Sequence, residues 1–135
     1  MKRSYIGLAL GALVVVAASV ALPSCGFDRK LVAITITPPG ANITGEGVEV
    51  DFQALGTYIH PPETDNITDS VVWASAAPQI VSIDATTGVA VSGAGCGTNI
   101  TITATAYSNP QDNSGSVVQG TALVSVAPPA GTTCP

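Results

Sequence analysis

The residues that could carry chemistry are few, and the sequence places several of them in one short segment. His60 is the only histidine, and Glu63, Asp65 and Asp69 follow it within nine positions. Such carboxylates could offer oxygen ligands to Ca²⁺, which takes roughly six to eight. A zinc site needs about three or four ligands in an ordered arrangement, and no second histidine or ordered cysteine pair accompanies His60. We expect an exposed acidic loop here, with a carbohydrate- or Ca²⁺-dependent recognition site as the alternative.

The sequence predicts no catalytic site. A serine nucleophile needs a neighbouring base, and the sequence places no serine in a recognisable catalytic motif with His60. The Gly-x-Ser-x-Gly turn of hydrolases does not occur. The spacing of the acidic residues selects no pair for general acid–base work. We therefore expect a protein without enzyme activity, cofactor or bound metal.

Two tyrosines leave a second possibility open. Tyr58 and Tyr107 fall near the ends of expected strands and could stack on sugar rings. Two rings make a small platform, and tyrosines in such places also close off a hydrophobic core. Both interpretations remain at this point.

The charge distribution argues against a nucleic-acid partner. The formal net charge is -5, and all the basic residues lie at or before position 30. The rest of the chain has acidic residues but no lysine or arginine. It therefore cannot neutralise phosphates, on which nucleic-acid affinity depends. For the same reason we do not expect it to lie on an anionic membrane surface.

The beginning of the chain is typical of a secretory signal. An uncharged apolar stretch covers residues 5–22. From its last residue the sequence reads LPSC, at residues 22–25. These letters resemble the lipobox of bacterial lipoproteins, although Pro23 replaces the usual small residue. The resemblance implies a signal peptide over residues 1–24, cleavage before Cys25 and a lipid on the Cys25 sulfur. The alternatives are an uncleaved transmembrane helix, or cleavage nearby by an ordinary signal peptidase.

All three alternatives place the remainder of the chain outside the cytoplasm. Lys2 and Arg3 precede the apolar stretch and favour a cytoplasmic N-terminus. We expect residues 25–30 to form the lipidated cysteine and a short linker. The protein would be anchored by its lipid to the cell envelope, at the outer membrane or the cell surface. Its further partner would be an unknown envelope protein or a glycan.

The number of cysteines fits an exported protein. Lipidation of Cys25 would leave Cys96 and Cys134 as an even pair, in a compartment where disulfides persist. Cys96 precedes one expected strand, and Cys134 follows the strand expected to pair with it. We therefore predict a disulfide between them. Free thiols or a bond between molecules are the alternatives.

From residue 31 onward, apolar and polar residues alternate with the period of a half-buried strand. The pattern predicts an all-β sandwich of about seven short strands over residues 31–127, with a tail over residues 128–135. Val32, Ile34 and Ile36 should share one face of a strand that the prolines after it end. The residues expected to be buried are Val50, Phe52, Trp73, Ile83, Ile100, Ile102 and Val124, whereas Glu49, Asp51, Thr101 and Thr103 should face water.

Several short motifs occur in the order and spacing of a known family. They are VAITITP at residues 32–38, VDFQALGTY at 50–58, VVWAS at 71–75, VSID at 81–84 and ITITAT at 100–105. Together they resemble the bacterial immunoglobulin-like domain of group 2, the module repeated in intimin- and invasin-type adhesins. The resemblance implies an immunoglobulin-like sandwich in an extracellular setting, with no catalytic residues. Those adhesins carry long tandem arrays, but this chain has one copy and a linker that spans only about 20 Å, so a long stalk is not expected.

Overall fold

The structure, a computed structural model, describes residues 28–135, so Cys25 and the expected signal peptide lie outside the described residues. This part of the chain is all-β, as predicted, but it has ten strands and one short 3-10 helix. The strands surround one hydrophobic core. They are β1 (Lys30–Thr37), β2 (Gly40–Thr44), β3 (Glu49–Asp51), β4 (Gln53–Ile59), β5 (Glu63–Asn66), β6 (Val72–Ser75), β7 (Val81–Ile83), β8 (Val89–Ser92), β9 (Gly97–Asn109) and β10 (Ser114–Ala127), with the helix η1 (Thr68–Ser70) between β5 and β6.

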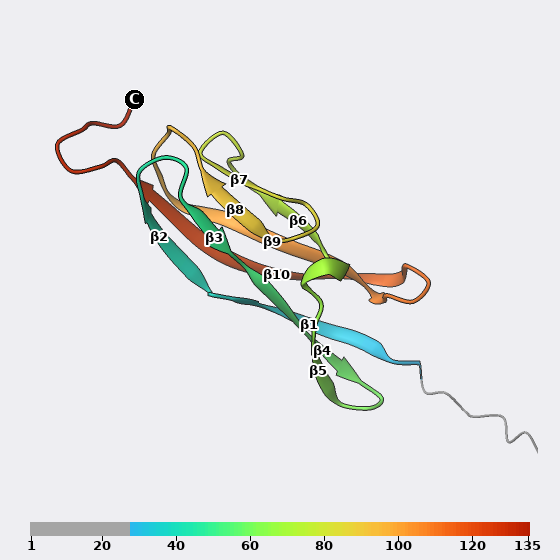
Figure 1. The fold of residues 1–135 in the computed structure, drawn as a ribbon. Coiled ribbons are helices and arrows are strands. Elements are labelled where there is room, and N and C mark those ends of the chain that lie inside the picture. Colours follow the sequence, from blue (N-terminus) through green and yellow to red (C-terminus); the bar gives the residue numbers. More distant parts are fainter. Residues whose placement is uncertain (1–27) are drawn as a thin grey trace, which may run out of the picture.

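The strands form two layers. One layer is a four-stranded sheet in the order β2-β10-β9-β6, in which β9 and β10 make a long antiparallel hairpin and β2 runs parallel to β10. The other layer contains two three-stranded sheets, β1-β4-β5 and β3-β8-β7, which the consecutive strands β3 and β4 connect. Because β1 and β2 are also consecutive, the chain crosses from one layer to the other between them (Figure 1).

The sequence pattern missed β2 because a pair of prolines seemed to end the preceding strand. The chain resumes an extended conformation at Gly40, and residues 40–44 pair with residues 123–127 of β10. A Cβ atom on Gly40 would lie 3.0 Å from the carbonyl oxygen of Leu123, so the small residue lets the two backbones approach. The prediction of a loop for the acidic segment was also wrong, since residues 63–66 of this segment form β5 and pair with β4.

The start of β1 corrects one expectation about the core. The pairing of β1 with β4 shifts register between Leu31 and Ala33. Such a bulge inserts one residue and reverses the alternation of side chains at that point. Leu31, Ile34 and Ile36 are therefore buried, whereas Val32 is 44% exposed. The prediction that Val32 shares a face with Ile34 and Ile36 was wrong.

The centre of the core was predicted correctly. Most of the residues expected inside are buried, but Val50 and Ile83 are only half-buried, because they lie on the short strands β3 and β7. Thr101 and Thr103 are half-buried rather than fully exposed, because the chain flanks both on two sides: β10 and β6 flank Thr103, and β10 and the segment just after β6 flank Thr101. The expected core residues that are buried are Phe52, Trp73, Ile100, Ile102 and Val124, and the expected exposed residues Glu49 and Asp51 are exposed.

The chain changes pairing partner at the point where β3 becomes β4. The amide of Phe52 donates to the carbonyl of Gly88, which ends the ladder between β3 and β8. Two residues later, the carbonyl of Ala54 accepts from the amide of Ile67, and the ladder with β5 begins. Residues two apart in a strand direct their hydrogen-bonding groups to the same edge. One edge of the chain is therefore shared between two short sheets.

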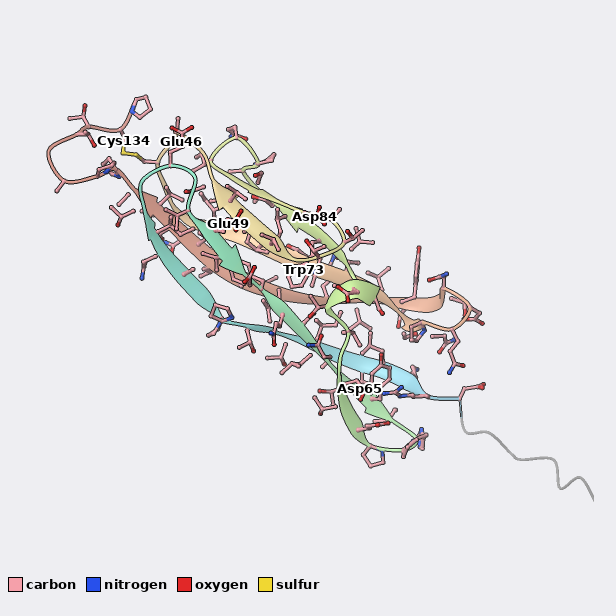
Figure 2. The ribbon with its side chains drawn as sticks, viewed as in Figure 1. Glu46, Glu49, Asp65, Trp73, Asp84 and Cys134 are labelled. Atoms are coloured by element: carbon pink, nitrogen blue, oxygen red, sulfur yellow. A yellow bond between two sulfur atoms is a disulfide. The ribbon has the colours of Figure 1, made fainter. Side chains whose placement is uncertain are left out.

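Trp73 fills the space beside this exchange. Its ring is only 2% exposed and lies 6.5 Å from the Phe52 ring, centroid to centroid. Its Nε1 donates to the carbonyl of Thr68 at 3.0 Å, so the buried polar group is satisfied. Gly88 is required next to it, since its φ is +76° and a Cβ atom there would lie 2.9 Å from the indole. Figure 2 shows Trp73 among the strands of the core.

The turn before Gly88 is held by an exposed carboxylate. Oδ1 of Asp84 accepts hydrogen bonds from the hydroxyl and amide of Thr86 and from the amide of Thr87. These hydrogen bonds, chiefly the one from the Thr86 hydroxyl, hold the pKa of Asp84 well below its ordinary value. The carboxylate therefore acts as a cap for the turn that places Gly88 under the indole.

We predict that Trp73→Ala lowers the free energy of unfolding by about 3–5 kcal/mol, because the change removes a buried ring and leaves a cavity. The matched control is Val72→Ala in the same strand, where the side chain is 64% exposed and the expected cost is within about 0.5 kcal/mol. Urea unfolding of both variants followed by circular dichroism measures the difference. Equal midpoints for the two variants would contradict the packing described here.

Candidate functional site

Among the described residues that the sequence singled out, the cysteine pair lies at one end of the sandwich, and Glu63 and Asp65 lie at the other. Figure 2 shows Cys134 at one end and Asp65 at the other. β1 begins at the Asp65 end, and the C-terminus lies at the Cys134 end (Figure 1). The length of the β9–β10 hairpin separates them.

Cys96 and Cys134 meet at the end where β9 begins and β10 ends. Their Cα atoms are 5.6 Å apart and their sulfurs lie at disulfide distance, as the sequence analysis predicted. Gly97 pairs with Val126 at the base of the hairpin, so the start of β9 lies beside the end of β10. The tail after β10 then turns back toward Cys96 through a hydrogen bond from the amide of Thr132 to the carbonyl of Pro129.

At the opposite end, Arg29 joins the segment just before β1 to the β4–β5 hairpin. Its guanidinium lies over the ring of Tyr58, with Cζ 3.9 Å from the ring centroid. Its Nη2 forms ion pairs with Asp65 and, at 3.4 Å, with Glu63. Glu63 and Asp65 are two residues apart in β5, and alternate strand residues share a face. This geometry lets one guanidinium contact both carboxylates.

Tyr58 is 4% exposed, which decides between the two interpretations of this residue. Leu31 pairs with it across β1 and β4, and Arg29 covers the ring. The ring therefore closes the end of the core and does not present a face for stacking on a sugar. Tyr107, by contrast, is 44% exposed.

The proposed ligand loop divides into parts with different surroundings. Glu63 and Asp65 face Arg29, whereas Asp69 lies in η1 and lines a separate hollow with Asp51. His60 lies at the turn between β4 and β5, with φ of 61°. Within residues 28–135, no group of three or more His, Cys, Asp or Glu side chains has the arrangement of a metal site.

Arg29, Tyr58, Glu63 and Asp65 form a cluster, which we call the Arg29 cluster. An open groove of about 700 Å³ lies between it and the end of the β9–β10 hairpin. Arg29 and Asp65 make one side of the groove charged, whereas apolar and uncharged polar side chains form the other side. The apolar side was not predicted from the sequence, although strand alternation could have indicated it. Val72 lies next to the predicted core residue Trp73, and neighbouring residues of a strand face opposite sides, so Val72 should face outward. Among the lining residues are Arg29, Asp65, Ile67, Val72, Tyr107 and Val117.

Comparisons with known proteins give no match. No protein-family model matches the chain, and no curated protein matches it. In the part that the structure describes, no helix is long and apolar enough to cross a membrane.

We predict that changing both Cys96 and Cys134 to Ser lowers the free energy of unfolding by up to about 4 kcal/mol. The disulfide closes a loop with a sequence separation of 38. Without it the unfolded chain has more conformational entropy, which favours unfolding. Urea unfolding of the variant and of the native protein, each with and without reductant, measures the difference. Reductant should lower the native midpoint to that of the variant. A native midpoint that reductant leaves unchanged, with the thiols shown to be free, would contradict the prediction.

We predict that Arg29→Ala costs about 1 kcal/mol of stability, a modest amount because the side chain is partly exposed. The change uncovers Tyr58 and leaves Glu63 and Asp65 as unpaired like charges. Arg29→Lys should recover part of the loss, because it keeps the charge but not the planar group that stacks on the ring. Urea unfolding at low and high salt measures both variants. An Arg29→Ala variant as stable as the native protein at low salt would show that the cluster is not stabilising.

Proposed function

We propose that the chain is an exported, lipid-anchored protein of the bacterial cell envelope, whose immunoglobulin-like domain binds or scaffolds another envelope component without catalysing a reaction. The observation that carries this proposal is the placement of the cysteines. Cys96 and Cys134 pair with each other, so Cys25 is the one remaining cysteine of the sequence. It directly follows the apolar stretch, at the position that bacterial lipoproteins acylate.

The strand order supports the immunoglobulin-like part of the proposal. Immunoglobulin-like sandwiches hold strands A, B, E and D in one sheet and C, F and G in the other. The chain order of this domain fits that scheme if β1, β3 with β4, β8 and β7 are the first set and β6, β9 and β10 the second. Trp73 lies on β6, which corresponds to strand C, where antibody domains carry a buried tryptophan. The disulfide here differs, since it joins β9 to the tail rather than the two sheets.

The start of β1 supports an anchor close to the domain. Contacts hold Arg29 against Tyr58 and β5. Three peptide units separate Asp28 from Cys25, a reach of about 10 Å. A lipid on Cys25 would therefore place the Arg29 end of the sandwich next to the membrane. The disulfide end would point away from it.

The second hypothesis, a carbohydrate- or Ca²⁺-dependent recognition loop from His60 to Asp69, has less support. Arg29 already neutralises Glu63 and Asp65, and Asp69 lines a different hollow. A cation would have to displace the guanidinium to bind the two carboxylates of β5. We therefore favour a non-catalytic binding or scaffolding domain.

We predict that Cys25→Ala leaves an unprocessed precursor without lipid, because the acylated thiol is missing. The matched control is Cys134→Ser, which removes a cysteine but keeps the proposed acylation site. Mass spectrometry of the protein from membranes, with incorporation of a labelled fatty acid, measures both variants. The control should carry the same lipid mass as the native protein. An unchanged mature mass in the Cys25→Ala variant would overturn the proposal of a lipid anchor.

A further inference from the structure

The four-stranded sheet contains no charged residue. None of the residues of β2, β6, β9 or β10 is Asp, Glu, Lys, Arg or His. Within residues 28–135, the charged residues lie on the strands of the other layer, in η1, before β1 or in turns, such as Asp112 at the tip of the β9–β10 hairpin. Depletion of charge is a mark of the central part of protein interfaces. In a chain with a net charge of -5, this sheet is the side on which charge is missing.

The outer face of this sheet also exposes large apolar side chains. Val117 pairs with Tyr107 across the hairpin, and Val72 on β6 pairs with Thr105. Leu123 lies further along β10 on the same face, because its neighbours Ala122 and Val124 point into the core. The exposed fractions are 64% for Val72, 57% for Val117, 47% for Leu123 and 44% for Tyr107.

We propose that this outer face binds a second copy of the same chain. An acidic chain repels its own copy wherever two charged surfaces meet, and like charges placed opposite each other oppose association. The strands of the four-stranded sheet carry no charge, so two copies that meet there avoid most of that repulsion. Asp65 and its partner Arg29 bring charge next to this face, across the groove that Val72 and Val117 also line. A basic partner would find no charge to attract it there. A glycan would find Tyr107 as the one aromatic ring of the four strands that is exposed.

The size of the face fits a modest dimer. β9 and β10 extend about 45 Å and together are about 10 Å wide, and the short strands β2 and β6 widen the face only over five and four residues. The two copies together would bury about 1,200 Å², at the lower limit of specific protein interfaces. Such an interface is consistent with a dimer that forms reversibly with concentration. Threonines between the apolar side chains, such as Thr103 opposite Thr121, supply hydrogen-bonding groups across it.

The direction of the face suits a symmetric pair. A closed dimer of identical chains uses the same patch on both copies, related by a two-fold axis. β9 and β10 run along the long direction of the molecule (Figure 1). With the axis parallel to these strands, both copies have their Arg29 ends on the same side. This last point rests on the proposed lipid anchor, since it lets both copies insert into one membrane, but the dimer itself does not require the anchor.

The experiment is sedimentation equilibrium of the full chain, purified from membranes in a density-matched non-ionic detergent, over a range of protein concentrations. We expect the native protein to shift from monomer to dimer with concentration. Val117→Glu and Val72→Glu each place two like charges in the interface and should weaken the dimer at least about 100-fold. The matched control Val32→Glu changes an exposed valine on β1, in the other layer, and should leave the dimer unchanged.

Circular dichroism and thermal unfolding confirm that each variant is folded before its mass is interpreted. A native chain that stays monomeric at all concentrations overturns the inference, as does a dimer that survives both Val117→Glu and Val72→Glu. Loss of the dimer in Val32→Glu also overturns it, because net charge alone would then be the cause. A monomer that sediments with another envelope protein or a glycan assigns the face to that partner instead. The lipid mass of the same samples is a separate readout, so a missing lipid contradicts the proposed function without deciding the dimer.

Discussion

The burial of Trp73 is the constraint on which the arrangement of the two layers depends. The chain from β3 to β4 changes its pairing partner at Phe52, so backbone hydrogen bonds alone do not hold the two short sheets together there. The indole lies against Phe52, and its Nε1 bonds to Thr68, so it ties β6 to the segment after β5. Gly88 leaves the room for the ring. A smaller side chain would leave this junction without packing, and a polar group without the bond to Thr68 would be costly to bury.

The two ends of the sandwich are closed by different interactions. At one end, Arg29 covers the core residue Tyr58 and pairs with the carboxylates of β5. At the other, the bond between Cys96 and Cys134 holds the tail, whose residues 129–135 are exposed. A covalent link suits a segment that buries little apolar surface, since burial alone would not offset the entropy of ordering it.

Charge divides the molecule between its two layers. The layer of β1, β3 and β5 carries charged side chains on its strands, and the layer of β9 and β10 carries none. Both layers bury a comparable apolar face against the common core, so the difference concerns only the surfaces that face outward. A threonine-rich, uncharged outer face on an otherwise acidic chain provides the surface on which the proposed dimer is based. The charged layer keeps the remaining surface soluble and separate from other copies.

Much of the fold and part of the site could be predicted from local pattern. The alternation of apolar and polar residues determined the all-β class and the central core, including Trp73 and Ile102, because a period of two requires a strand with one buried face. The position of Cys96 before one strand and Cys134 after its neighbour was enough to predict their pairing, because antiparallel neighbours bring such ends together. These features depend on residues close in sequence or on one simple pairing.

Tertiary structure alone decided the rest. The bulge beside Leu31 exposes Val32, and only the partner strand determines where an extra residue is accommodated. The acidic segment became β5 because the edge of β4 offered it hydrogen bonds, a possibility that its polar composition did not suggest. Arg29 contacts Tyr58 and Asp65, which follow it in the sequence by 29 and 36 residues. Such a contact requires the pairing of β1, β4 and β5, because this pairing brings side chains that are remote in the sequence to one end of the sandwich.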